Sequence, residues 1–211
     1  MSNPLHDLFI QAEQPDNHNS LMKILGKLSS RYEFLEKLHE ESNRVFTKQK
    51  DLASGREVVI VQLTSDSEPE LKQFKKEMDL SSRLQHPGIV PVYDAGKNQD
   101  KLFFSRKWID DDSLEKRSLT KEKIWNKEQL VRIFLQLCEA LNYAHSLGIS
   151  HNNLTERKVF ISESGNVSIT DWSKAKLMDK AGQRNDIQAM GNLLNTLGFL
   201  CIDFESLPGG L

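Results

Sequence analysis

The feature that most constrains the fold of this chain is a change of hydrophobic pattern near residue 109. Before that point, short runs rich in β-branched and aromatic residues predict strands. The predicted strands lie at residues 31–38, 43–50, 57–63, 89–93 and 101–108. One amphipathic helix is expected between the third and the fourth strand, at residues 67–84, with Pro69 in its first turn.

After residue 109 the pattern predicts mainly helix. Apolar residues recur at helical spacing from Leu130 to Ala144, and Gly148 is expected to end this helix. A short hairpin is expected at residues 159–161 and 167–170, and a last helix at residues 187–200. The predicted fold class is therefore α+β, with a five-stranded antiparallel lobe that carries one helix, followed by a mainly helical lobe.

Composition and charge exclude several classes of protein. Of the 211 residues, 38% are hydrophobic and 27% are charged, which is typical of a soluble globular protein. The net charge of −2 favours neither nucleic acid nor an anionic membrane as a partner, and no apolar run is long enough to span a bilayer. Cys138 and Cys201 lie in apolar helical patterns, so we expect small buried hydrophobic residues in a reducing, cytoplasmic setting.

Residues 1–30 are predicted to be a helical extension. Apolar positions indicate one short amphipathic helix at residues 5–12 and a second at residues 20–28. One-sided helices of this length need a surface to pack on. Two interpretations remain open: the extension docks on the chain's own body, or it binds a partner.

Five short motifs follow one another in a specific order. They are residues 74–77 (Phe-Lys-Lys-Glu), 84–90 (Leu-Gln-His-Pro-Gly-Ile-Val), 141–151, 171–173 (Asp-Trp-Ser) and 186–191 (Asp-Ile-Gln-Ala-Met-Gly). In this order and spacing, residues 31–200 resemble the serine/threonine protein kinases, bacterial members in particular. The resemblance implies a kinase N-lobe at 31–108 and a truncated C-lobe at 109–211, running from the αD helix to the αF helix.

The resemblance also implies that the positions of phosphate chemistry are altered. Val61 stands at the position of the lysine on the third strand, and Asn153 at that of the catalytic aspartate. Thr155 stands at the position of a phosphate-stabilising lysine, and Lys158 at that of an Mg²⁺-binding asparagine. The turn at residues 39–44, which aligns with the glycine-rich loop, has no glycine and two carboxylates. The resulting expectation is a pseudokinase that is not an enzyme, although family similarity alone would still class it with the kinases.

Several other positions keep family residues or fill the expected nucleotide pocket. Glu77 is expected to be either exposed or paired with another cation, and Asp171 to form a structural ion pair with Lys158 rather than a magnesium site. His151 and Asp186 are expected to be architectural. Side chains that would fill the adenine pocket are Phe46, Val59, Arg106 and Phe160. ATP and Mg²⁺ are therefore not expected as ligands, and Asp171 is the one candidate metal ligand.

Three functions compete at this point. The first is a protein-binding scaffold or regulator in signalling, whose partner is an active kinase or a second copy of the chain. The second is residual ATP binding or weak kinase activity through a rearranged site, with a relocated lysine such as Lys48 or Lys158. The third is a remnant without function. Neither nucleic acid nor a membrane is expected as a partner.

Overall fold

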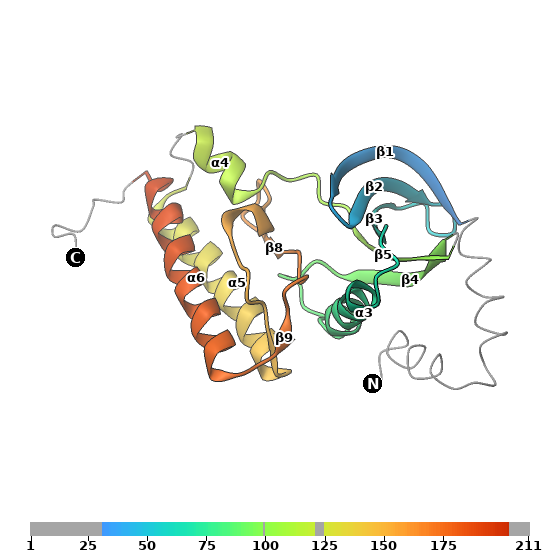
Figure 1. The fold of residues 1–211 in the computed structure, drawn as a ribbon. Coiled ribbons are helices and arrows are strands. Elements are labelled where there is room, and N and C mark those ends of the chain that lie inside the picture. The colour runs from blue at the N-terminus through green and yellow to red at the C-terminus, as the bar shows by residue number, and fades with distance from the viewer. Residues whose placement is uncertain (1–30, 99, 121–124, 203–211) are drawn as a thin grey trace. The chain divides into compact units, whose positions relative to one another are not determined.

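A five-stranded antiparallel sheet forms the first unit of the chain. The computed structural model describes residues 31–98, 100–120 and 125–202, and the helices expected at residues 1–30 lie outside these ranges. The strand order is β1 (Tyr32–Glu41), β2 (Arg44–Asp51), β3 (Glu57–Leu63), β5 (Lys101–Lys107) and β4 (Val92–Asn98). The β-branched run of β3 lies at the centre of the sheet, as its composition predicts (Figure 1).

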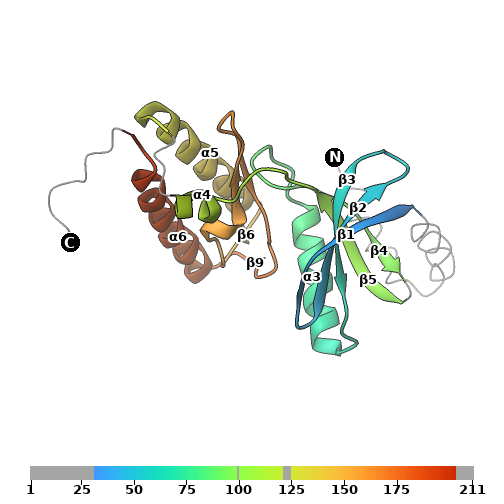
Figure 2. The same cartoon turned by 90° about the horizontal axis from the view of Figure 1, so that it is seen from above.

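Helix α3 (Glu68–Ser82) covers one face of this sheet (Figures 1 and 2). Phe74 and Met78 on the helix are buried against Val61, Leu63 and Phe104 on the strands. Val58, Ile60 and Phe103 lie in a second, smaller cluster on the sheet. Because neighbouring residues of a strand point to opposite faces, β3 supplies apolar side chains to both clusters.

The second unit is mainly helical. Its helices are α4 (Leu114–Thr120), α5 (Lys127–Ser146) and α6 (Lys180–Phe199), and α5 and α6 lie side by side in both views. Its short strands pair as β6 (Ile149–Ser150) with β9 (Lys176–Leu177), and β7 (Val159–Ile161) with β8 (Val167–Ile169). Asn126 begins α5 with a reciprocal capping box with Gln129, and Asp179 caps α6 through the amide of Gly182. The predicted α+β class is confirmed.

Two elements differ most from the sequence-based prediction. The fourth strand was expected at residues 89–93 but runs from Val92 to Asn98. Ile89 and Val90 belong to the second unit instead, where the amide of Val90 donates to the carbonyl of Ile169 at 2.9 Å. The last helix begins at Lys180 rather than at residue 187, because its first turns are polar and carry little apolar periodicity.

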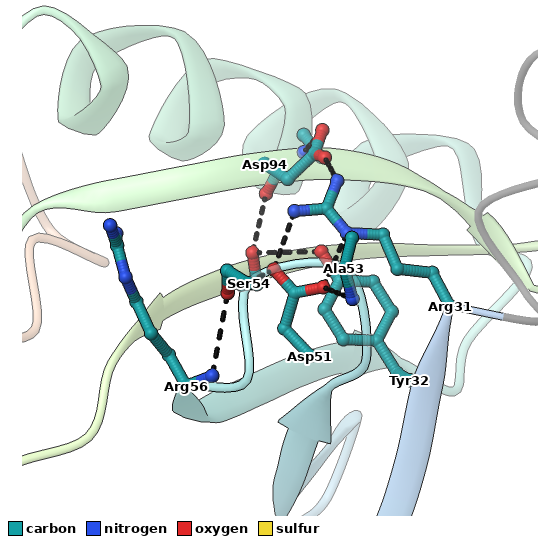
Figure 3. Close-up of polar contacts among 9 residues, drawn as sticks. Arg31, Tyr32, Asp51, Ala53, Ser54, Arg56 and Asp94 are labelled. Atoms are coloured by element: carbon teal, nitrogen blue, oxygen red, sulfur yellow. Dashed lines mark hydrogen bonds and ion pairs between the residues drawn. The ribbon is translucent and has the colours of Figure 1, made fainter.

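A cluster of ion pairs fixes the start of β1. The Arg31 guanidinium donates to both carboxylate oxygens of Asp51, at 2.6 and 2.5 Å, and to Asp94 at 2.7 Å (Figure 3). Ser54 and the amide of Ala53 also donate to Asp51. The Arg31 guanidinium holds the pKa of the Asp51 carboxyl well below its usual range, whereas burial raises the pKa of Asp94.

Two further features bear on earlier expectations. Within the ranges described, no helix is long and apolar enough to cross a membrane. Cys201 is buried and Cys138 half-buried, and both are free thiols. Burial, and then the charge of Glu139, raises the pKa of the Cys138 thiol, which disfavours the reactive thiolate.

Candidate functional site

The position of the third-strand lysine carries a fully apolar side chain. Val61 is 1% exposed and packs in the cluster beneath α3. Its neighbours across the sheet are Phe46 on β2 and Phe104 on β5. Val61 therefore offers no polar group to a ligand.

Glu77 is buried on α3 and has a cation beside it. Its Oε2 atom lies 2.7 Å from an Nη atom of Arg44, and the two side chains are only 4% and 10% exposed. The Arg44 guanidinium also lies over the ring of Phe74, 5.3 Å from its centroid. Of the two alternatives that the sequence left for Glu77, pairing with another cation is the one observed.

Strand register explains why Arg44 reaches this point. Arg44 is the first residue of β2, two positions before Phe46, so both side chains point to the same face of the sheet. Phe46 stands opposite Val61, and Arg44 stands opposite Leu63. In the sequence, the alternation from Phe46 is the signal for this placement.

The side chains expected to fill an adenine pocket are distributed over both units. Val59 is 4% exposed on β3, with Arg106 as its partner on β5. Phe46 is half-buried and stacks on His39, with ring centroids 4.0 Å apart. Phe160 lies in β7 of the second unit and is half-buried. The pocket-filling roles of these residues stay predictions.

The two lysines considered as relocated cations both have acidic neighbours away from Glu77. Lys48 on β2 lies 2.9 Å from Glu57 and 4.7 Å above the ring centroid of Trp108. Lys158 lies in the second unit, 2.9 Å from Asp171. The cation beside Glu77 is Arg44, and a role for Lys48 or Lys158 in a rearranged site stays a prediction.

Asp186 holds the loop that begins at His151. This carboxylate is 1% exposed and accepts from the backbone amides of His151 and Asn152, both at 2.8 Å. It also lies 2.8 Å from Nε2 of His145 on α5. One carboxylate at the beginning of α6 thus fixes a loop and a neighbouring helix, which is an architectural arrangement.

His151 is fully buried against Trp172, with ring centroids 4.5 Å apart. Its Nε2 atom lies 3.2 Å from the carbonyl oxygen of Thr170. Burial, and then the nearby charge of Lys158, lowers the pKa of His151 from 6.5 to about 4. At neutral pH the imidazole is therefore uncharged.

The ion pair expected between Lys158 and Asp171 is present. Lys158 Nζ lies 2.9 Å from Asp171 Oδ2, and the amide of Ser173 donates to Oδ1. Burial alone would raise the pKa of Asp171, but the Lys158 charge and these hydrogen bonds lower it to about 2. Asn153 and Thr155 in the same loop are exposed and uncharged.

The donor set around Asp171 does not fit Mg²⁺ as it stands. Mg²⁺ needs oxygen ligands in octahedral geometry. The Oδ2 atom of Asp171 already pairs with the ammonium group of Lys158. Among the described residues, no three His, Cys, Asp or Glu side chains gather as a metal site. In unit 1 the cation beside Glu77 is Arg44.

Comparison with known proteins places the chain in a family. A model of the protein kinase domain matches residues 32–199. The serine/threonine-protein kinase PknD of Protochlamydia amoebophila is 28% identical over 173 residues, which is 69% of this chain and 18% of that protein. The probable serine/threonine-protein kinase CPE1738 of Clostridium perfringens is 28% identical over 174 residues, or 80% of this chain and 25% of that protein.

A eukaryotic relative gives a similar result. The NUAK family SNF1-like kinase 2 of Rattus norvegicus is 27% identical over 183 residues, covering 84% of this chain and 29% of that protein. The chain thus spans less than a third of the length of each of these three relatives.

The expectation that the chain is not an enzyme is contradicted by these relatives. They are named as kinases, two of them as serine/threonine-protein kinases, and nothing in the similarity shows inactivity. The assignment of Val61, Asn153, Thr155 and Lys158 to catalytic positions stays a prediction, and it does not outweigh a family match over most of the chain. The chain belongs to the protein kinase family.

Proposed function

We propose that this kinase domain works in signalling as a scaffold or regulator that binds a protein partner on helix α6. The observation that carries the proposal is an exposed row of residues on α6, namely Ile187, Gly191, Asn195 and Phe199, which we call the α6 row. Ile187 is 61% exposed and Phe199 is 81% exposed. Ile187 and Phe199 lie at the two ends of the row, about 18 Å apart along the helix axis. Large apolar side chains exposed to this degree are typical of a contact surface.

The α6 row lies in a segment without charge. From Ile187 to Ile202 the sequence contains no Lys, Arg, Asp, Glu or His. A solvent-facing helix ordinarily carries charged residues on its outer side. Depletion of charge together with exposed apolar groups is the compositional mark of the centre of a protein interface.

The spacing of the row favours a helix as the occupant. Its members recur every fourth residue, which forms one of the ridges by which helices pack against each other. A Cβ added at Gly191 would meet nothing within 4 Å, so this position is an open notch in the ridge. We therefore propose an uncharged, apolar helix of a second protein as the partner surface.

Other properties of the chain support the same kind of partner. The net charge of −2 gives no general attraction for nucleic acid or for anionic lipid. Two free thiols support a reducing, cytoplasmic setting.

The test compares two double variants. Ile187→Lys with Phe199→Lys places charge on the α6 row, and Phe34→Lys with Leu52→Lys does the same at two exposed apolar residues of unit 1. A candidate partner is first identified by crosslinking in cells and is then reconstituted from purified proteins. We expect the α6 variant to lose roughly tenfold or more in affinity, since a charge at an interface centre costs over 1.4 kcal/mol.

The matched control should bind the partner like the unaltered chain. Equal binding by both double variants would overturn the proposal, as would the absence of any partner that reconstitutes. Light scattering of the purified chain over a wide range of concentration separates self-association from binding of another protein. If deletion of residues 1–30 alone increases the accessibility of the α6 row to solvent, residues 1–30 occupy this row and the proposed partner does not.

ATP binding through a rearranged site is the second candidate function. The specific observation in its favour is the pair of Arg44 and Glu77, which keeps a buried cation beside the glutamate of α3. Titration of the purified chain with ATP, followed by thermal stability, tests this candidate. Saturable stabilisation of about 2.7 kcal/mol at a hundredfold excess over Kd would support it.

A further inference from the structure

The buried pair of Arg44 and Glu77 has the chemistry of a phosphate-binding element. In protein kinases a lysine on the third strand contacts both the nucleotide phosphates and the glutamate of the neighbouring helix. Val61 stands at that lysine position here and is buried among apolar side chains. Arg44 contacts the same glutamate from the adjacent strand, at 2.7 Å.

Arg44 lies on β2, the strand beside the one that carries Val61. Phe46 is the cross-strand partner of Val61, and Arg44 lies two residues before Phe46 on the same face of the sheet. An arginine is longer than the aliphatic side chains around it. It can therefore serve the same glutamate from this neighbouring site.

The guanidinium group has donors to spare. It carries five N–H groups in a planar fork, and one carboxylate engages at most two of them. The central carbon of the guanidinium lies over the Phe74 ring, 5.3 Å from the centroid, so the ring attracts and helps to hold the cation. A planar fork held in this way is suited to bidentate contact with phosphate oxygens.

We propose that Arg44 replaces the third-strand lysine of this kinase domain, pairing with Glu77 and donating to a phosphate group of a bound nucleotide. The inference rests on the second candidate function, ATP binding. Glu41 is the backbone partner of Arg44 across the hairpin, and its exposed carboxylate repels phosphate. The affinity for triphosphate is therefore expected to be weaker than a glycine-rich turn would give.

Nucleotide binding by single variants tests the role of Arg44. The probes are ATP and adenosine, each titrated into the full chain by calorimetry without Mg²⁺. Arg44→Met should weaken ATP binding by roughly tenfold or more, since a charge-assisted contact contributes over 1.4 kcal/mol. Adenosine binding should not change, because adenosine has no phosphate. Lys50→Met, which removes an exposed cation of β2, should leave both affinities unchanged.

Two further measurements keep the inference testable if Arg44→Met does not fold. Arg44→Lys keeps the charge and should retain most of the ATP affinity. In the unaltered chain, the Nε–Hε signal of Arg44 in an NMR spectrum should shift with ATP and not with adenosine. This second measurement needs no variant.

The outcomes separate the inference from the function on which it rests. If the unaltered chain binds ATP and Arg44→Met binds it equally well, the role of Arg44 is overturned while ATP binding stands. The same conclusion follows if the Arg44 signal is insensitive to ATP that is shown to bind. If the unaltered chain shows no saturable binding of ATP, both are overturned.

Discussion

A glutamate buried on the inner face of a helix needs a positive partner. For Glu77 on α3, this partner comes from the strand β2. The Arg44 and Glu77 side chains are almost fully enclosed. Desolvation of two charges costs nearly as much as their attraction returns, so such a pair adds little net stability. Removal of one member is different, because it leaves an uncompensated charge inside the unit.

This asymmetry predicts the result of a double-mutant cycle. Arg44→Met alone should lower the free energy of unfolding by about 3–5 kcal/mol. The combination of Arg44→Met with Glu77→Leu should be more stable than Arg44→Met alone, because no unpaired carboxylate remains. Urea unfolding of the four proteins measures both effects. A double variant that is less stable than the single one would contradict the prediction.

His151 makes the stability of the second unit depend on pH. Its pKa in the folded chain is about 4, below the ordinary value of 6.5, so the unfolded chain binds this proton more readily. The stabilising contribution is complete above pH 6.5 and is lost as the pH falls toward 4. The loss over this range should be about 2–3 kcal/mol.

Substitution of the histidine isolates its contribution. We expect His151→Gln to be less stable than the unaltered chain at both ends of this range, with a smaller difference between them. His39→Gln, on the exposed part of β1, serves as the control for loss of one histidine. Denaturant unfolding at pH 6.5 and pH 4 provides the comparison. An unchanged pH dependence in His151→Gln would contradict the assignment.

At the level of single elements, two glycines of α6 have opposite surroundings. A Cβ at Gly182 would lie 2.5 Å from the hydroxyl oxygen of Ser150 and 3.1 Å from its Cβ, in the buried strand β6. A Cβ at Gly191 would meet nothing within 4 Å. The first glycine therefore allows close approach of helix and strand, whereas no contact within the described residues requires a glycine at the second.

The two alanine variants should change stability in opposite directions. Gly191→Ala should stabilise the chain by about 0.5–1 kcal/mol, because alanine loses less backbone entropy in a helix. Gly182→Ala should destabilise it, because Ser150 or the first turn of α6 must shift. Thermal unfolding of both variants measures the difference. Stabilisation by Gly182→Ala would show that the contact relaxes without cost.

The central elements could be predicted from local pattern, and the others could not. The strand β3 is a continuous β-branched run, the helices α3 and α5 have helical periodicity, and in each the pattern matches the burial. The short elements α4, β6 and β9 carry neither signal. The strand β4 was misplaced because Ile89 and Val90 are apolar for a different reason, namely contact with β8.

The residues of the candidate site also divide into those that local sequence motifs indicate and those that only the folded structure brings together. Asp171, Lys158, His151 and Asp186 could be found because they lie in motifs read along the chain. Arg44 could not be found in that way, because its contact with Glu77 depends on the register of a hairpin and on the packing of a helix. A pairing across a sheet becomes visible in sequence only when the register is already known.

At the scale of the whole molecule, the chain is a kinase domain that covers only part of each relative. The described residues fall into two compact units, and the ion pairs of Arg31 tie the segment just before β1 to the sheet of the first unit. Arg31 bridges the end of β2 and the strand β4, which lie at a distance in the sequence (Figure 3). The stability of unit 1 therefore depends in part on the contacts of Arg31, just before β1.

Removal of this cluster should be costly. Arg31→Ala should lower the free energy of unfolding by roughly 2 kcal/mol, since it leaves the carboxylate of Asp51 enclosed without its main donor. The variant should also raise the pKa of Asp51, which Arg31 now depresses, as NMR titration of its carboxyl carbon can show. Lys37→Ala removes an exposed pair with Glu40 and should cost under about 0.5 kcal/mol. Equal losses in both variants would contradict the role of Arg31.

The cluster at Arg31 also has a mechanical consequence. The strand β1 lies at the edge of the sheet, so a force applied to the chain before Arg31 would peel it from β2 one pair of hydrogen bonds at a time. The ion pairs with Asp51 and Asp94 stand ahead of those hydrogen bonds and must break first. Tension applied before Arg31 must therefore break these ion pairs before the hydrogen bonds between β1 and β2 can separate one pair at a time. The domain should yield in one abrupt step rather than gradually.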